Sequence, residues 1–494
     1  MTEASLAHKN FISGRLLAKN TLWNLFGQGA PLLAAIFAIP ILIERLGTER
    51  YGVLTLAWMV IGYFSLFDLG LGRALTKLTA DRIGVGKEEE IQSLAWTALG
   101  VMLALSLVGV LAVCLLSPWL VHRALKIPSE LQADTLRAFY WLGWSIPVVI
   151  GTSGLRGLLE AYQRFGLVNA IRIPMGLFTF LGPLLVLPFS RSLTAVVAVL
   201  VVGRTLAWAA HALLCLRVIP GLCQKVSLAP GEIKPLLAFG GWMTVSNVVG
   251  PLMVYLDRFL IGAVLSMAAV AYYATPYELV TKLWIFPTAL LGVLFPAFAA
   301  SLAQSHDQTA SLFGQGLKGL FLSLFPIVLV MVVVAEEGLT LWLGAEFAKN
   351  SIFVFQWLSI GVFLNCLAQV SFALIQSAGR PDITAKLHLL ELPFYLLVLW
   401  WAMSEYGLKG TAIAWVLRIF VDMLALNACV KKILPQCKIH LNRLSFATMV
   451  SLGVLITGTM IHGFVQKIIY LIVVLVVFLI ASIKTIYRKN HMIF

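Results

Sequence analysis

Charged residues are scarce in this sequence: Asp, Glu, Lys and Arg together make up 12% of its 494 residues, whereas soluble domains carry about 25%. The sequence also lacks the GxxxxGKS/T loop that binds ATP phosphates, the HExxH zinc motif and the GxSxG nucleophile elbow. Its six cysteines show no CxxC spacing, so neither a disulfide framework nor a metal knuckle is indicated. We therefore expect a protein that is not an enzyme and that holds no metal or cofactor of its own.

Apolar residues dominate instead, at 60% of the chain. They gather in about 14 stretches, each near the length of roughly 20 residues that an α-helix needs to cross a bilayer. The sequence therefore predicts an all-α polytopic membrane protein. The predicted spans are 20–43, 51–71, 91–121, 136–155, 167–188, 193–216, 236–264, 267–300, 317–335, 351–376, 387–403, 410–430, 444–464 and 468–486.

Lys and Arg are distributed unevenly over the connections between these spans. One side of the membrane receives about 22 of them and the other about 8, and such an excess marks the cytoplasmic side. Because the number of spans is even, we expect both termini in the cytoplasm. The net charge of +14 is then an orientation signal that attracts anionic membrane lipids, and nucleic acid is not an expected partner. The first stretch lacks a clear small-residue cleavage site and should remain as the first span.

A weak internal repeat indicates how the spans are grouped. Trp23 and Pro31 recur as Trp242 and Pro251, at an offset of about 220 residues. Six spans separate the copies, so both repeats would keep the same orientation in the membrane. This pattern predicts a six-helix lobe over residues 1–220, a second six-helix lobe over 221–435 and two additional helices over 436–494. Chance matches between apolar helices are the alternative explanation.

Five ionisable residues fall near the middle of predicted spans: Arg204, Glu278, Lys282, Arg418 and Asp422. An ionised side chain at the bilayer centre costs about 2.5–3.5 kcal/mol on insertion scales, so these residues require a polar interior. Glu278 and Lys282 are four residues apart, as are Arg418 and Asp422, so each pair can meet on one helix face. Mutual neutralisation in a packed bundle and a role in a hydrophilic pathway are both open for these pairs.

Arg204 differs because no acidic residue lies within four positions of it. Its partner is either a carboxylate from another span, such as Asp68, or an anionic ligand in a water-filled cavity. We favour the ligand. Asp257 and Arg258 are adjacent, so on a helix they point about 100° apart. Their place near the end of a span also allows them to snorkel to the interface.

Basic residues also cluster at the predicted cytoplasmic ends of two spans. Arg156, Glu160 and Arg164 would share one helix face at the end of the fourth span, and Arg73 lies with Asp68 at the end of the second. These residues fit either the ordinary positive-inside bias or a basic vestibule that captures phosphate headgroups from the inner leaflet.

Four short segments carry a further signal. They are Lys19–Asn24 (KNTLWN), Pro40–Tyr51 with its Leu46-Gly47 turn, Phe67–Gly72 (FDLGLG) and Ser377–Pro381 (SAGRP). In these segments, and in its span number and lobe plan, the sequence resembles the polysaccharide flippases of the multidrug/oligosaccharidyl-lipid/polysaccharide exporter superfamily.

This resemblance implies two lobes in a V-shaped arrangement around a cationic central cavity. Alternating access would carry a polyprenyl-diphosphate-linked oligosaccharide from the cytoplasmic to the outer leaflet of the bacterial inner membrane. H+ or Na+ would be the coupling ion, and polysaccharide-assembly proteins would be partners. The substrate would meet the cavity cations Arg204, Lys282, Arg418 and Arg258. The candidate carboxylates for ion coupling or charge pairing are Glu278, Asp422, Asp257 and Asp68, with Glu391 as a further suitable group, and no spacing selects one of them.

Two other functions stay open at this point. A cation-coupled multidrug exporter of the same superfamily would favour an acidic, aromatic cavity, which the basic residues disfavour. A membrane enzyme of polysaccharide assembly would present a sizeable outer loop with catalytic Arg, His or Glu, and the sequence has none. We favour the flippase, because a diphosphate must not meet hydrocarbon and a midplane arginine can accept it in charge-assisted, bidentate hydrogen bonds.

Overall fold

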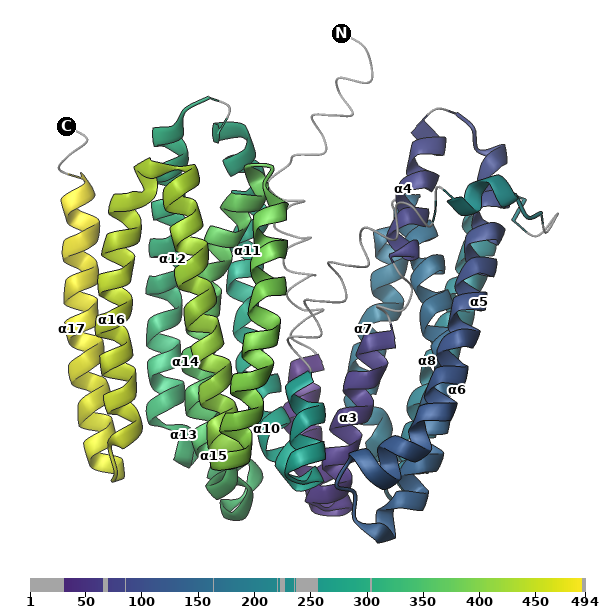
Figure 1. The fold of residues 1–494 in the computed structure, drawn as a ribbon, viewed down its shortest axis with the longest axis horizontal. Coiled ribbons are helices and arrows are strands. Elements are labelled where there is room, and N and C mark those ends of the chain that lie inside the picture. The colour runs from purple at the N-terminus through teal and green to yellow at the C-terminus, as the bar shows by residue number, and fades with distance from the viewer. Residues whose placement is uncertain are drawn as a thin grey trace. The chain divides into compact units, whose positions relative to one another are not determined.

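The computed structural model describes residues 31–64, 70–84, 86–162, 164–219, 221–222, 227–234, 236, 256–302 and 304–490. Its elements are helices, and the described part of the chain contains no strand. The described residues form two compact units (Figure 1). Unit 1 comprises the described residues up to 236 with Ser266–Ala268, and unit 2 comprises Leu256–Leu265 and the residues from Ala269 onward. The three-part division at 220 and 435 stays a prediction.

The predicted spans are helical over most of their described length. The repeat residues Trp23, Trp242 and Pro251 lie outside the described residues, so the repeat also stays a prediction. Unit 1 contains helical residues 31–46, α3 (Thr48–Phe64), α4 (Leu71–Gly84), α5 (Glu89–Trp119) with the π-turn η1 (Leu120–Ala124), α6 (Ser129–Ala161), α7 (Phe165–Val186), α8 (Leu193–Val218) and the 3-10 turn η2 (Pro230–Glu232).

Helix α6 is central to unit 1 and packs against α3, α4, α5 and α8. Small residues let these helices approach closely: a Cβ atom on Gly157 would lie 2.6 Å from the carbonyl oxygen of Gly72 in α4. Near the start of α6, the Asp134 carboxylate accepts the backbone N–H groups of Leu193 at 2.7 Å and Thr194 at 3.1 Å. These N–H groups have no partner within a helix that begins there. Asp134 therefore caps α8 and fixes it against α6.

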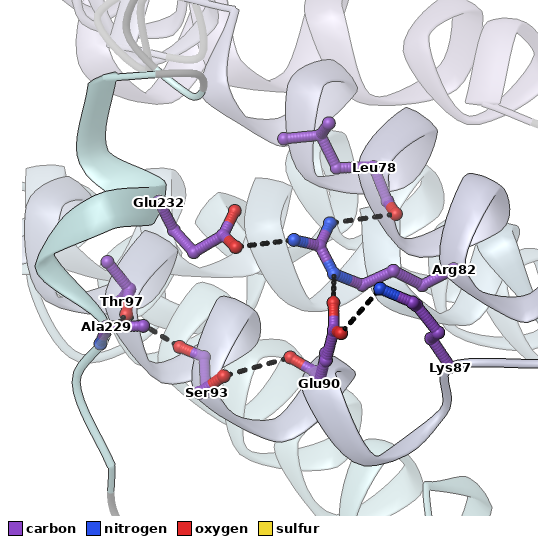
Figure 2. A network of polar contacts seen from close by, with 8 residues as sticks. All are labelled: Leu78, Arg82, Lys87, Glu90, Ser93, Thr97, Ala229 and Glu232. Carbon is purple, nitrogen blue, oxygen red and sulfur yellow. Dashed lines mark hydrogen bonds and ion pairs between the residues drawn. The ribbon is translucent and has the colours of Figure 1, made fainter.

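The segment that follows α8 is tied back to α4 and α5 (Figure 2). Arg82 of α4 donates from Nη2 to Glu232 at 2.6 Å and from Nε to Glu90 at 3.3 Å. The Ala229 backbone N–H donates to Thr97 Oγ1 of α5 at 2.9 Å. The segment thus lies against unit 1 at the side where α4 ends and α5 begins.

Unit 2 is built around α14, which packs against α11, α12, α13 and α15. The elements are helical residues 256–264, α10 (Met267–Val280), the 3-10 turn η3 (Thr281–Trp284), α11 (Ile285–Leu302), α12 (His306–Val333), α13 (Ala335–Leu343), α14 (Ala345–Ser377), α15 (Pro381–Ile433), the 3-10 turn η4 (Pro435–Cys437), α16 (Lys438–Met460) and α17 (Phe464–Asn490).

Two connections between predicted spans of unit 2 take a defined form in the structure. The predicted spans 387–403 and 410–430 are two arms of α15, joined where the chain bends at Gly407 with φ 57° and ψ −136°. Glycine adopts positive φ without the steric cost that a Cβ atom brings. The predicted connection 336–350 is mostly helical, because α13 covers it and α14 begins at Ala345.

The last two helices lie side by side (Figure 1), and the Tyr470 hydroxyl of α17 donates to the Val454 carbonyl of α16 at 2.6 Å. Helix α17 leaves large apolar side chains uncovered, including Ile472 at 57% and Val477 at 61% exposure. In a membrane protein such a face contacts lipid tails, which are as apolar as the side chains.

Candidate functional site

A pocket of about 230 Å³ lies within unit 1, between α6, α7 and α8. Each helix contributes residues that recur every three or four positions and therefore share one face. The lining residues are Val149, Thr152, Ser153 and Arg156 of α6, Val168, Ile171, Arg172 and Met175 of α7, and Arg204, Ala207 and His211 of α8.

Three arginines face this pocket from three different helices. Arg204 is half-buried and forms no ion pair with any described residue. Arg172 is exposed, and Arg156 places Nε 3.6 Å from Glu160 Oε1 of its own helix. No acidic side chain is among the described lining residues. The pocket is therefore positive and can accept an anion through guanidinium N–H donors.

His211 also lines the pocket and is 4% exposed. Its Nδ1 lies 2.8 Å from the carbonyl oxygen of Ala207, one turn earlier in α8. Nε2 is buried and has no hydrogen-bond partner among the described residues. The ring is thus oriented by its own helix and leaves one nitrogen for a ligand.

Only some of the unit 1 residues predicted as site residues lie at this pocket. Arg156 and Arg204 both line the pocket. Arg164 does not extend the face of Arg156, because α6 ends before it and Arg164 is the residue that precedes α7. The expectation of one shared helix face is wrong. Arg73 is exposed on α4 and does not line the pocket, and Asp68 lies outside the described residues.

Sequence reasoning missed Arg172 and His211. Arg172 lies inside predicted span 167–188, so it meets the criterion that singled out Arg204, a charge within an apolar stretch. His211 gave no comparable signal, because the role of a histidine depends on what each ring nitrogen meets in space.

Asp257 and Arg258 of unit 2 are buried, at 0% and 2% exposure. The Asp257 carboxylate accepts hydrogen bonds from the Tyr273 hydroxyl at 2.8 Å and from the backbone N–H of Arg258 at 2.7 Å. The guanidinium carbon of Arg258 lies 4.2 Å from the centroid of the Tyr277 ring, in a cation–π contact. The expectation that these charges snorkel to the interface is therefore wrong.

A second group of charges joins the two arms of α15. Glu391 and Asp422 are 9% and 6% exposed, and no described N–H or O–H donor reaches either oxygen of Glu391. The Glu391 carboxyl lies within hydrogen-bonding reach of Asp422, and Asp422 Oδ1 is 3.6 Å from His388 Nε2. The guanidinium carbon of Arg418 lies 5.3 Å from the centroid of the Tyr395 ring. Arg418 and Asp422 thus each contact residues of the other arm.

Lys282 and Glu278 meet as their spacing predicted, with Nζ donating to Oε2 at 3.3 Å. Their side chains are 41% and 46% exposed. An ion pair so open to its surroundings contributes little to stability, so both groups can separate to meet a ligand.

The described part of the chain contains ten helices that are long and apolar enough to cross a membrane. Together with the two helical units and the cationic pocket inside one of them, these helices define an all-α, multi-pass membrane protein.

Comparison with known proteins identifies its family. The profile of the polysaccharide biosynthesis protein family matches residues 17–302, more than half of the chain. A putative O-antigen transporter from Shigella flexneri is 33% identical over 412 residues, which are 83% of this chain and 97% of that relative. The chain belongs to the polysaccharide biosynthesis protein family.

Two solved structures share the fold. An inward-facing multidrug resistance MATE family transporter of the MOP superfamily superposes with a TM-score of 0.71 at 13% identity, over 85% of this chain and 95% of its own. The lipid II flippase MurJ in an inward closed conformation gives a TM-score of 0.70 at 12% identity, over 96% and 99%. At such identities the likeness concerns the fold alone.

Proposed function

We propose that this protein is a flippase. It moves a polyprenyl-diphosphate-linked oligosaccharide from the cytoplasmic to the outer leaflet of the bacterial inner membrane by alternating access, and it catalyses no chemical step. The name of its Shigella flexneri relative, a putative O-antigen transporter, supports this substrate class. The observation that carries the proposal is Arg204, a half-buried arginine in a pocket between membrane-spanning helices, without an ion pair among the described residues.

The pocket offers a route for the diphosphate. Arg156 and Arg172 lie near the end at which α6 runs into α7. Arg204 precedes His211 in α8 and lies about 10 Å farther from that end. A diphosphate that passes from the first two arginines to Arg204 keeps its charge against guanidinium donors, away from hydrocarbon. The positive lining also disfavours a cationic drug as the substrate.

We place the α6–α7 end of the pocket on the cytoplasmic side. The positive-inside bias assigns that side to the connections richest in Lys and Arg, and Arg164 and Arg217 lie at this end of α7 and α8. Both termini are then cytoplasmic, and the pocket opens toward the leaflet from which the substrate is taken. Polysaccharide-assembly proteins are the expected partners.

We further infer that an H+ or Na+ gradient drives the cycle through Glu391 and Asp422. Two adjacent buried carboxyl groups repel each other when both are ionised, so the pair favours the uptake of a proton or a metal cation. Glu391→Gln and Asp422→Asn should therefore abolish the dependence of transport on the gradient. Glu278→Gln, in the half-exposed pair with Lys282, is the control. Unchanged gradient dependence in both variants of the buried pair contradicts the assignment.

Arg204→Ala tests the function itself. The change removes an insertion cost of about 2.5–3.5 kcal/mol, so the amount of folded protein should stay equal or rise. Transport should fall by about tenfold or more, because the diphosphate loses a charge-assisted partner. Arg204→Lys should recover only part of it, since an ammonium lacks the planar fork. The measurement is the appearance of lipid-linked glycan on the outer leaflet at matched protein level.

Arg137→Ala is the matched control, because Arg137 is an exposed arginine of α6 that does not line the pocket. Full transport by Arg204→Ala would contradict the proposal. Loss of folded protein would assign Arg204 to a structural ion pair with a carboxylate outside the described residues.

A further inference from the structure

His211 is the polar group of the pocket that the flippase proposal does not use. Its Nδ1 lies 2.8 Å from the Ala207 carbonyl oxygen, and its buried Nε2 has no hydrogen-bond partner among the described residues. Because a carbonyl oxygen can only accept, Nδ1 carries a hydrogen in both protonation states of the ring. The proton that His211 gains or loses is therefore the one on Nε2, the nitrogen that no described residue binds.

The described charges around His211 come from all three helices of the pocket and are positive apart from one carboxylate already paired. A protonated Nε2 finds no acceptor among the described residues, and a neutral Nε2 presents a lone pair that repels an incoming oxyanion. The charged residues are Arg156 with its partner Glu160 on α6, Arg172 on α7 and Arg204 on α8.

Among the described elements, α8 also packs against α3. The charged residues of α3, Glu49 and Arg50, lie in its first turn, and Glu49 accepts the backbone N–H of Ala268 at 3.0 Å. One turn beyond His211, the Cys215 thiol donates to the Leu155 carbonyl with an S···O distance of 3.2 Å. Neither α3 nor Cys215 therefore supplies a counter-ion to the imidazole.

We propose that this pocket binds a phosphate-type oxyanion together with one proton, which His211 takes up on Nε2. The proton comes from solvent: an N–H bond forms on the ring, and nothing is oxidised or reduced. The imidazolium then donates to an anion oxygen beside the guanidinium groups, so the binding of a phosphate or diphosphate ester and the binding of the proton favour each other. This inference goes beyond the flippase proposal and applies whether or not the anion crosses the membrane.

Proton uptake makes the affinity for the anion depend on pH. Where free His211 is neutral and anion-bound His211 is charged, the affinity falls about tenfold for each unit rise in pH. A pocket that used arginines alone would bind equally well across this range, because a guanidinium does not deprotonate. The pH profile therefore separates the two modes of binding.

The probe is P1,P2-dimethyl diphosphate, whose two charges do not titrate in the range where histidine does. Isothermal titration of the full-length protein in detergent, in buffers of different ionisation enthalpy, counts the protons taken up. We expect up to about one proton per anion and the tenfold slope. His211→Gln, whose amide does not titrate, should bind without proton uptake and with a flat profile. His122→Gln, at an exposed histidine that contacts Gln132, should behave like the unaltered protein.

Anion binding without proton uptake by the unaltered protein overturns the proposal, and so does uptake that survives in His211→Gln. Absence of binding, or binding that persists in Arg204→Ala with unchanged affinity, overturns the site. If His211→Gln does not fold, selective ¹⁵N labelling of histidine decides: one ring becomes imidazolium when the probe is added, and no change in any ring contradicts the proposal. Failure of the flippase proposal would appear only in the outer-leaflet assay and would leave these results unchanged.

Discussion

The guanidinium of Arg82 donates from Nη2 to the Glu232 carboxylate at 2.6 Å, and this bond joins α4 to a position 150 residues further along the chain. The two side chains are 14% and 24% exposed, so the pair is better shielded than an ordinary surface ion pair. A second donor of Arg82, Nη1, reaches the Leu78 carbonyl at 3.4 Å (Figure 2). Arg82 therefore holds the chain that leaves unit 1.

Arg82→Ala should release the segment around Glu232 without unfolding unit 1. Loss of about 1–2 kcal/mol of hydrogen bonding raises the open fraction about tenfold, so the backbone amides around Glu232 should exchange their hydrogens about tenfold faster. Combining Arg82→Glu with Glu232→Arg should restore part of the protection. The control is Lys87→Ala, which removes only an exposed partner of Glu90. Equal exchange rates in both single variants would contradict the role given to Arg82.

Lys467, near the start of α17, has a side chain that is only 6% exposed. It donates to Glu336 at 2.7 Å and to Glu337 at 2.9 Å, both in α13. A buried ammonium without partners costs more than a pair replaced by an apolar side chain. The double variant Glu336→Gln/Glu337→Gln should therefore lower the thermal unfolding midpoint more than Lys467→Met does. The reverse order would show that the ammonium reaches water without these carboxylates.

The same contact predicts a loss of stability in acid. The hydrogen bond from Lys467, followed by its positive charge, lowers the pKa of Glu336 below its ordinary value of 4.5. A carboxylate with a lowered pKa stabilises the folded state above its ordinary value, and this contribution is lost as the pH falls through 4.5 and below. The unfolding midpoint should drop in this range less steeply in Glu336→Gln than in the unaltered protein. Equal slopes would assign the acid sensitivity to other carboxylates.

The positions of the spans could be predicted because crossing a bilayer requires a local property, a long apolar stretch whose backbone bonds are satisfied within the helix. The break between spans 387–403 and 410–430, where the chain bends at Gly407, could be predicted in the same way. Helix α13 could not, since its sequence does not change local hydropathy enough to separate a loop from a short helix. Arg204 could be predicted as a candidate site residue because a charge within a long apolar stretch is visible in the sequence and costly to bury.

The contacts of these charged residues with residues distant in the sequence could not be predicted. Spacing alone paired Glu278 with Lys282 correctly, because both lie within one turn of the chain. Asp422 meets His388 and Glu391 across the bend of α15, and this contact depends on how two arms of a helix return on each other.

Tyr273→Phe should destabilise unit 2. The change removes the hydroxyl that donates to Asp257 at 2.8 Å and leaves part of a fully buried carboxylate without that bond, at a cost of about 1–3 kcal/mol. Tyr395→Phe is the matched control, because the Tyr395 hydroxyl is buried without a described hydrogen-bond partner and its removal should be neutral or stabilising. Unfolding midpoints in detergent compare the two. Equal losses would show that the Asp257 contact contributes nothing specific.

Orientation decides whether the arginine pocket opens toward the cytoplasm. Because Lys and Arg favour the cytoplasmic connections, reporter fusions after Lys225 and after Lys438 should read cytoplasmic. A fusion near Glu346, in the first turn of α14 and next to the acidic α13, should read external. Paired reporters that are active on opposite sides of the membrane give each reading its own control. A cytoplasmic reading at Glu346 would remove the topology of about 14 spans. The distribution of Lys and Arg would then no longer support the cytoplasm as the side from which the pocket takes its anion.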